Sequence, residues 1–401
     1  MKSTIRIVTL ATILITARAY GQYYFAGSPW SSTVSAQSLG MGGVGTAFVS
    51  DNAAATIANP AQLGIFSLGG GLNAATDLTG SLNFSAVNAG TSLNRIGVKL
   101  PFQTSVGLGY SNISFTYLPY SGGPLIVTKK IGTFNGVSAA LGLDYFIKIG
   151  LGYTLKWIDY MPFYGIPFRR TGEDFGALLQ IPITSIVDHE KERTFKETSG
   201  IEPRVDFNIG YDMRDYGSYN PNETLFTEAN LGWSIQAGLM SELAGHSWDW
   251  FSVSWSMQAG ASPFQTDSTI AGIYGTDTTW NYLEWYQKGL GHFGIWRNLI
   301  VGSASQSVAI SKGGEIGLGE FLYVRTGEFN YAGPQTYKTF GWGLRLDGLI
   351  KTLVFLKTLS PRSPVTDFFL NHVDLEYDFG RVYDTAYFGG ETFESLNLVV
   401  R

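Results

Sequence analysis

Apolar and polar residues alternate along much of the chain with a period of two. Between residues 137 and 157 the odd positions are apolar or aromatic, whereas the even positions are mostly glycine, serine, threonine or charged residues. Successive side chains of a β-strand point to opposite faces, so this pattern predicts strands with one apolar and one polar face. The stretch is long enough for two strands and predicts a hairpin with a tight turn near 144–147.

The same alternation predicts strands elsewhere. It is clearest at 205–211, 251–258, 340–347 and 373–379. Apolar residues at odd positions between 175 and 183 predict one further strand. It is needed because the segments on either side are expected to be external loops, and a single strand cannot join two loops on the same side of a barrel. Weaker patterns predict strands at 81–87, 95–100, 106–110, 113–117, 231–239, 308–318, 319–324, 350–356 and 396–400. The charged run 189–196 is expected to be a turn. Together these segments predict roughly a dozen or more strands, with an even total.

The apolar faces favour lipid over a protein core as their environment. A water-soluble sandwich would also alternate, but here the apolar positions repeatedly end in tyrosine or tryptophan, as at Tyr153 and Trp157. Aromatic girdles and a polar lumen are typical of outer-membrane barrels. The predicted fold class is all-β, a transmembrane antiparallel β-barrel. We accordingly expect arginine to be harmful at Leu151, on the apolar face, and tolerated at Thr154, on the polar face.

Composition supports a membrane barrel. The chain has 401 residues, including 50 glycines, and only 15% of its residues are charged, against about a quarter in soluble proteins. After residue 20 no apolar run is long enough to span a bilayer as a helix. A net charge of −5 argues against nucleic acid as a partner. The chain has no cysteine, which excludes disulfides and thiolate chemistry.

The N-terminus predicts a secretory signal peptide over 1–19. Lys2 and Arg6 form a positive region, 7–15 is a short apolar stretch, and small residues precede the expected cleavage after Ala19. The apolar stretch is about half of the ~20 residues that a membrane span needs. We therefore expect export and location in the outer membrane.

The segment 38–64 predicts a plug. Asp51 or Asn52 can cap a short helix over 53–58, and Pro60 ends it, because proline pushes the preceding residue out of the helical region. Glycines that permit close backbone approach precede this helix at Gly40, Gly42, Gly43 and Gly45. Small residues and a short helix suit a compact plug in a narrow lumen.

These glycines also match the G-x-G-x-x-G dinucleotide fingerprint. That fingerprint requires a preceding strand, a following long helix and an acidic residue about 20 positions on. No βαβ alternation follows here, so nucleotide binding is not expected. The chain is expected to divide into a signal peptide over 1–19, a hatch over 20–66 and a barrel over 67–401.

The segment resembles the N-terminal hatch of the FadL-type outer-membrane family, which includes long-chain fatty-acid channels and the PorV and PorQ proteins of type IX secretion. The shared features are the glycines at 40–45, Asp51-Asn52-Ala53 and Asn59-Pro60-Ala61. The resemblance implies a barrel of about 14 strands with the hatch inside the lumen.

Two functions follow from this resemblance. One is a plugged channel for hydrophobic small molecules, and the alternative is a PorV/PorQ-like structural or shuttle component that binds secretion-system proteins. In both cases the expected surroundings are outer-membrane lipid. The pocket residues of the fatty-acid channels cannot be matched here, and the chain ends in Arg401, whereas many outer-membrane barrels end in an aromatic residue.

Charged residues on the polar face are the remaining candidates for chemistry. The inward cations Lys148, Lys156 and Arg345 could bind a carboxylate ligand or pair with inward acids such as Asp144 and Asp347, and pairing is favoured. Three carboxylates share one strand face, where they could bind a hard cation or simply line a water-filled lumen, the favoured alternative; they are Asp374, Glu376 and Asp378. The four histidines are isolated in the sequence, and no metal, cofactor or enzymatic activity is expected.

Overall fold

The structure is a computed structural model, and the predicted signal peptide lies outside the residues it describes. None of the described helices combines the length and hydrophobicity that a membrane-spanning helix requires. The described residues are 35–78, 84–98, 102–117, 129–160, 168–187, 200–216, 228–243, 246–261, 295–304, 308–330, 336–361, 363–383 and 392–401.

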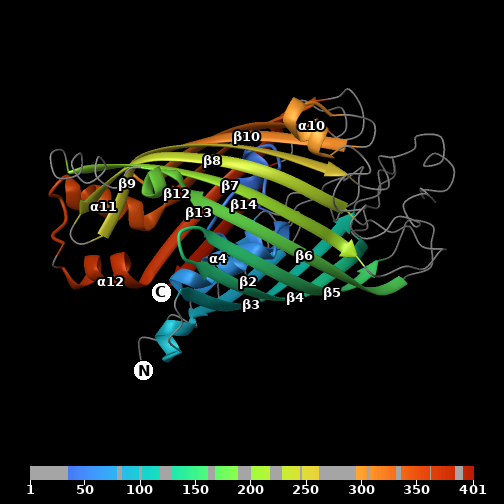
Figure 1. Ribbon diagram of the computed structural model, residues 1–401, viewed down its shortest axis with the longest axis horizontal. Coiled ribbons are helices and arrows are strands. Elements are labelled where there is room, and N and C mark those ends of the chain that lie inside the picture. The colour runs from blue at the N-terminus through green and yellow to red at the C-terminus, as the bar shows by residue number, and fades with distance from the viewer. Residues whose placement is uncertain are drawn as a thin grey trace, which may run out of the picture.

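The strands form one closed antiparallel barrel (Figure 1). Each pairs with its neighbours along the chain, and β1 pairs with β14 to close the sheet. The predicted all-β barrel of about 14 strands is confirmed. The strands are β1 Gly71–Asp77, β2 Phe84–Ser92, β3 Gln103–Tyr117, β4 Lys129–Asp144, β5 Lys148–Tyr160, β6 Phe168–Pro182, β7 Ile201–Tyr216, β8 Glu228–Leu243, β9 His246–Ala261, β10 Val308–Leu318, β11 Leu322–Asn330, β12 Thr336–Arg345, β13 Val373–Tyr383 and β14 Thr392–Val400.

Short helices precede the barrel, connect its strands or lie beside it. Three of the helices in the described residues come before β1, and blue ribbon marks this segment inside the barrel in Figure 1. The helices are α2 Ala36–Gly40, α3 Ala55–Ala58, α4 Ala61–Gly69, the 3₁₀ helix η1 Leu93–Ile96, α5 Ile183–Val187, α10 Ile295–Val301, α11 Leu346–Phe355 and α12 Pro364–His372.

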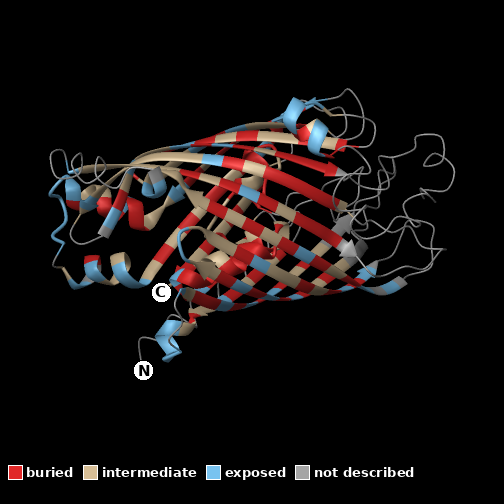
Figure 2. Cartoon of the chain, in the orientation of Figure 1, coloured by how far each residue is buried: buried red, intermediate tan, exposed pale blue. Residues whose placement is uncertain are grey.

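Burial follows the predicted alternation (Figure 2). On β4, Ser138 and Ala140 are buried in the lumen, whereas Val137 and Leu141 are exposed on the outside. The predicted hairpin is also present, because β4 ends at Asp144 and β5 begins at Lys148, after a connection of three residues. The apolar faces therefore point outward.

The two ends of the barrel differ. The end that holds the tight β4–β5 and β10–β11 connections also holds α11, α12 and the C-terminus of β14. We call it the turn end, and the opposite end the loop end. Both names describe connectivity alone.

Some predicted strands are wrong. Residues 350–356 belong mostly to α11, because Ile350 and Val354, four residues apart, are both buried and lie on one helical face. Residues 95 and 96 belong to η1, and Gly97, directly after this helix, adopts the left-handed region (φ 90°). The strand predicted from residue 319 begins at Leu322, after a turn. The predicted turn 189–196 lies outside the described residues.

Candidate functional site

The N-terminal segment fills the middle of the barrel lumen. We call residues 35–70 the hatch. Its helix α2 contacts β11 to β14, and α4 contacts β2 to β6 on another part of the wall. Hatch residues such as Met41, Val44 and Leu63 are fully buried. The helix α4 crosses the boundary predicted at residue 66, and β1 begins at Gly71.

Glycines on the wall strands let the hatch backbone touch the strand backbone. A Cβ atom at Gly142 on β4 would collide with the carbonyl oxygen of Gly64, and one at Gly152 on β5 would collide with the backbone of Pro60. Across the lumen, a Cβ at Gly313 on β10 would collide with the carbonyl group of Met41. The hatch is therefore seated where these strands carry no side chain.

The glycines of the hatch itself also allow close contact with neighbouring atoms. A Cβ at Gly40 would lie 2.9 Å from the Cα of Gly341 on β12, and one at Gly45 would lie 2.8 Å from the Cβ of Ala58. Gly42 and Gly43 follow α2 with φ angles of 73° and 83°, a region that side chains disfavour. All four therefore occupy positions where a side chain would cause a clash or strain.

Asn59 fastens the hatch to the wall. It is fully buried and extended (φ −150°, ψ 112°). Its Nδ2 donates to the carbonyl oxygens of Thr46 at 2.7 Å, Ala177 on β6 at 3.3 Å and Tyr211 on β7 at 3.4 Å. Its Oδ1 accepts from the N–H of Ala61 at 3.0 Å.

The signature Asn59-Pro60-Ala61 thus joins two hatch segments to two strands. Pro60 is the N-cap residue of α4, and Ala61 is the first residue of that helix. The helix predicted over 53–58 is present as α3 from Ala55. Asn52 accepts from the N–H of Ala54 at 2.9 Å, whereas Asp51 turns to the cavity described below.

Further wall side chains satisfy the hatch backbone. Gln258 on β9 accepts from the N–H groups of Gly45 and Thr46 at 3.0 and 3.1 Å. Thr339 on β12 accepts from the N–H of Gly42 at 2.9 Å and donates to the carbonyl oxygen of Gly40 at 3.0 Å. Buried backbone groups need such partners, so polar inward residues bind the hatch at many points.

Beside α2 the wall carries a buried ion-pair network. Arg325 on β11 is fully buried and contacts Asp378 on β13. Its other partners are Glu315 on β10 at 2.5 Å and Glu376 at 3.5 Å. The prediction of a water-filled lumen is therefore wrong at the position of this network, because Arg325 and Asp378 have no exposed surface. Hatch and wall exclude water there.

The three sequence-predicted carboxylates of β13 lie in the lumen. Asp374 pairs with Arg345 at 2.5 Å, while Glu376 and Asp378 face Arg325. Within the described ranges, no group of three histidine or acidic side chains is placed to hold a metal ion. The carboxylates form ion pairs with two arginines inside the lumen.

The three predicted cations are not brought together. Lys156 is buried and pairs with Asp174 on β6 at 2.5 Å. Arg345 pairs with the hatch residue Asp51 at 2.9 Å and lies 3.5 Å from Asp347. Lys148 is half-buried at the turn end. Pairing with acids therefore accounts for Lys156 and Arg345, and neither is left free for a carboxylate ligand.

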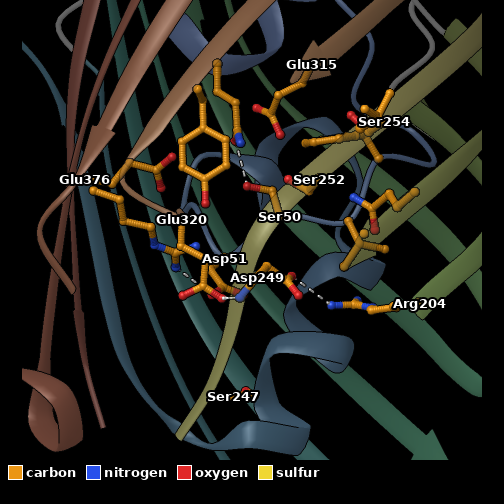
Figure 3. Close-up of a pocket in the computed structure, with 18 of the residues that line it drawn as sticks. Ser50, Asp51, Arg204, Ser247, Asp249, Ser252, Ser254, Glu315, Glu320 and Glu376 are labelled. Carbon is orange, nitrogen blue, oxygen red and sulfur yellow. Dashed lines mark hydrogen bonds and ion pairs between the residues drawn. The ribbon is translucent and has the colours of Figure 1, made fainter. Parts of the chain in front are cut away.

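Between the hatch and the turn end lies a cavity of about 330 Å³ (Figure 3). Serines and two glutamines line it together with many charged residues, and α11 contributes Asp347 and Lys351. The ten charged residues of this lining are Asp51, Arg204, Asp249, Glu315, Glu320, Arg345, Asp347, Lys351, Glu376 and Arg401. We call this space the charged cavity.

Ion pairs cross the charged cavity. Lys351 contacts Glu320 at 2.5 Å and Asp347 at 3.4 Å, and Arg401 reaches Asp51 at 3.2 Å. Burial alone would raise the pKa of the Asp347 carboxyl, but Arg345 and Lys351 outweigh it and hold that pKa below its usual value. The lining suits water and polar solutes and offers little to an apolar molecule.

No protein-family model and no curated protein sequence matches the chain. Among solved structures, the toluene transporter TodX of Pseudomonas putida is similar at 12% identity, covering 96% of this chain and 98% of its own, with a TM-score of 0.33. A FadL homologue of Pseudomonas aeruginosa has 10% identity, 92% and 97% coverage and a TM-score of 0.36. LpxR from Salmonella typhimurium has 9% identity, 82% and 98% coverage and a TM-score of 0.34. The strand pairing of the chain itself gives the 14-strand barrel that the resemblance noted in the sequence implies.

Proposed function

We propose that the chain is an outer-membrane barrel whose outward face is embedded in lipid. Large apolar side chains are exposed on the outward positions of many strands. They include Leu108 (67%), Leu141 (51%), Leu151 (48%), Trp255 (44%) and Ile316 (48%). Soluble monomers rarely expose contiguous apolar surface on this scale, whereas outer-membrane barrels carry such a band. The turn end would then face the periplasm and the loop end the outside, since periplasmic connections are the shorter ones.

Within that membrane, the function we favour is a gated channel for hydrophobic small molecules. The carrying observation is that the hatch fills the lumen but is held by non-covalent contacts, so that a solute can pass only if the hatch moves. The hatch motif, which resembles that of fatty-acid channels, supports this choice. The proposed function involves no catalytic step.

Uptake measurements test the channel. A strain that lacks the gene should grow more slowly on long-chain fatty acids or aromatic hydrocarbons as sole carbon source, and the wild-type gene should restore growth. A gene with Asn59→Ala provides the matched variant, because the change removes side-chain bonds between hatch and wall and leaves the outer surface unchanged. Unchanged growth and uptake in the deletion strain would contradict the channel.

One observation favours the alternative, a PorV/PorQ-like structural or shuttle component of protein secretion. The space beneath the hatch is lined by charged side chains, which favour polar over apolar contents. Comparing the proteins that a deletion strain releases into its medium with those of the wild type separates the two functions. Loss of secreted proteins with normal hydrocarbon uptake would support the secretion role.

A further inference from the structure

An apolar helix lies against the outside of the barrel near the loop end. The helix α10 contacts β8, β9 and β10 (Figure 1). Two of its side chains, Ile295 and Leu299, are 1% and 5% exposed. They pack on Ala229, Leu231, Ala259, Val308 and Ile310.

The strand positions beneath α10 face outward. Asn230, between Ala229 and Leu231, bonds to Asp212 at 3.0 Å inside the lumen. Gln258, the neighbour of Ala259, accepts from the hatch backbone. Because side chains alternate along a strand, the residues that α10 covers point away from the lumen. The helix therefore lies on the surface that carries the exposed apolar side chains.

The far side of α10 is also apolar, and its side chains are largely exposed among the described residues. Trp296, Ile300 and Val301 are 48%, 81% and 66% exposed, and Figure 2 shows exposed residues on this helix. Exposing such side chains to water is unfavourable. Their position on the outside of the wall makes this patch continuous with the outward apolar band, through Trp233 and Met257 beneath the helix.

Along the barrel axis, α10 lies at the level where the outward apolar band ends. Lys312 and Glu328 form an outward ion pair at 3.6 Å, and a Cβ at Gly302, directly after α10, would lie 3.7 Å from the Cε of Lys312. Toward the turn end the outward residues of β10 are apolar and exposed, namely Ile316 and Leu318. The helix thus lies where polar and apolar outer surfaces meet.

Arg297 is the remaining exposed residue on the outer side of α10. An arginine beside exposed apolar side chains fits a membrane interface, where the guanidinium reaches polar headgroups while its neighbours enter the acyl region.

The helix α10 ends in a defined turn. Gly302 adopts φ 69°, and the side chain of Asn298 donates to the carbonyl oxygen of Ser303 at 2.7 Å.

We propose that α10 is an interfacial membrane anchor. Trp296, Ile300 and Val301 contact the acyl chains of the outer leaflet, and Arg297 contacts lipid phosphate. The helix thereby fastens residues 295–301, which precede β10, to the membrane surface. This proposal depends on the membrane location proposed above but not on the transported substance.

Single-cysteine labelling tests the anchor. The protein has no cysteine, so Ile300→Cys provides its sole thiol for an environment-sensitive fluorophore. The full-length protein is placed in phosphatidylcholine vesicles with iodide available on both sides, or in vesicles that carry a spin-labelled lipid. Ile235→Cys, at an exposed outward position of β8, is the lipid reference, and Thr358→Cys, exposed after α11, is the water reference.

The anchor predicts that the spin-labelled lipid quenches the label at position 300 at least half as strongly as the label at position 235. It also predicts that iodide quenches position 300 several-fold less than position 358. Strong iodide quenching without lipid quenching would overturn the anchor and place α10 in water. Quenching by neither agent would also overturn it, because protein would then cover the helix. If position 235 itself escaped lipid quenching, the membrane location would fail instead.

Discussion

Two regions of the lumen differ in what fills them. Around the hatch, glycines such as Gly142 and Gly152 bring the strands into contact with the hatch backbone. Beneath the hatch, charged side chains surround a cavity of about 330 Å³. The first region cannot accept an added methyl group without movement of the backbone, whereas the side chains of the second can rearrange. In the proposed channel the hatch would therefore be the barrier to passage, and the charged cavity a vestibule.

The largest effect is expected at Arg325, where the two regions meet. Arg325→Met removes the cation that faces Glu315, Glu376 and Asp378. Breaking a buried ion pair by deleting one partner costs about 3–5 kcal/mol, so the folded barrel should lose about that much stability in detergent. Denaturant titration followed by the gel mobility of the folded barrel measures it. Adding Asp378→Asn to the variant should recover part of the loss, and equal stability of wild type and R325M would contradict the buried network.

A side chain at the glycine contact should have the next largest effect. Gly142→Val places a branched side chain where Gly64 now touches β4, and overpacking costs about 1–3 kcal/mol. Limited proteolysis should cleave the hatch of this variant faster than that of the wild type. Ala139→Val, on the exposed face of the same strand, is the matched control and should leave cleavage unchanged. Equal cleavage of all three proteins would mean that the hatch does not rest on β4.

Asn59→Ala tests the polar fastening of the same region. The change removes the side-chain bonds to Thr46, Ala177 and Tyr211. Leaving buried polar groups without partners costs about 1–3 kcal/mol, so ion leakage through the barrel should rise while the barrel still folds. Asn371→Ala, at an exposed site on α12, is the control. Conductance as low as that of the wild type would remove Asn59 from the closing mechanism.

The smallest effect is expected in the charged cavity. Arg401→Ala removes an ion pair with Asp51 whose side chains are 47% and 41% exposed. Such pairs contribute about 0–1 kcal/mol, and Arg345 still holds Asp51 at 2.9 Å. Stability should therefore change by less than about 1 kcal/mol in the same titration. A loss as large as that of Arg325→Met would show that the two regions do not differ in the proposed way.

Alternation predicted the strands well because one face of each strand carries exposed apolar side chains and the other faces the lumen. It failed where this contrast ends, as in 350–356, where packing at the turn end selects a helix. Arg325 was missed because the strand predicted over 319–324 stopped one residue short of it. A longer alternating window, with Tyr323 and Arg325 on one face, would have included it.

The seat of the hatch was not predictable from the sequence. Inward glycines on β4 and β5 fit the expected polar face equally well whether water or a hatch lies beside them. For the same reason Thr154 was expected to tolerate arginine. It is only 4% exposed and bonds Ser138 at 2.7 Å, so we now expect arginine there to disturb the packed lumen. Strand pairing across the barrel, which a local pattern does not contain, decides which positions the hatch covers.

Single-channel conductance tests the central claim most directly. Removing residues 36–69, which contain α2, α3 and α4, leaves the strand pairing and the outward apolar band in place. The shortened protein should still insert into planar bilayers and conduct ions steadily, whereas the wild-type barrel should remain almost closed. A correctly folded shortened barrel with the same conductance as the wild type would contradict the account, because the hatch would then not be the element that closes the lumen.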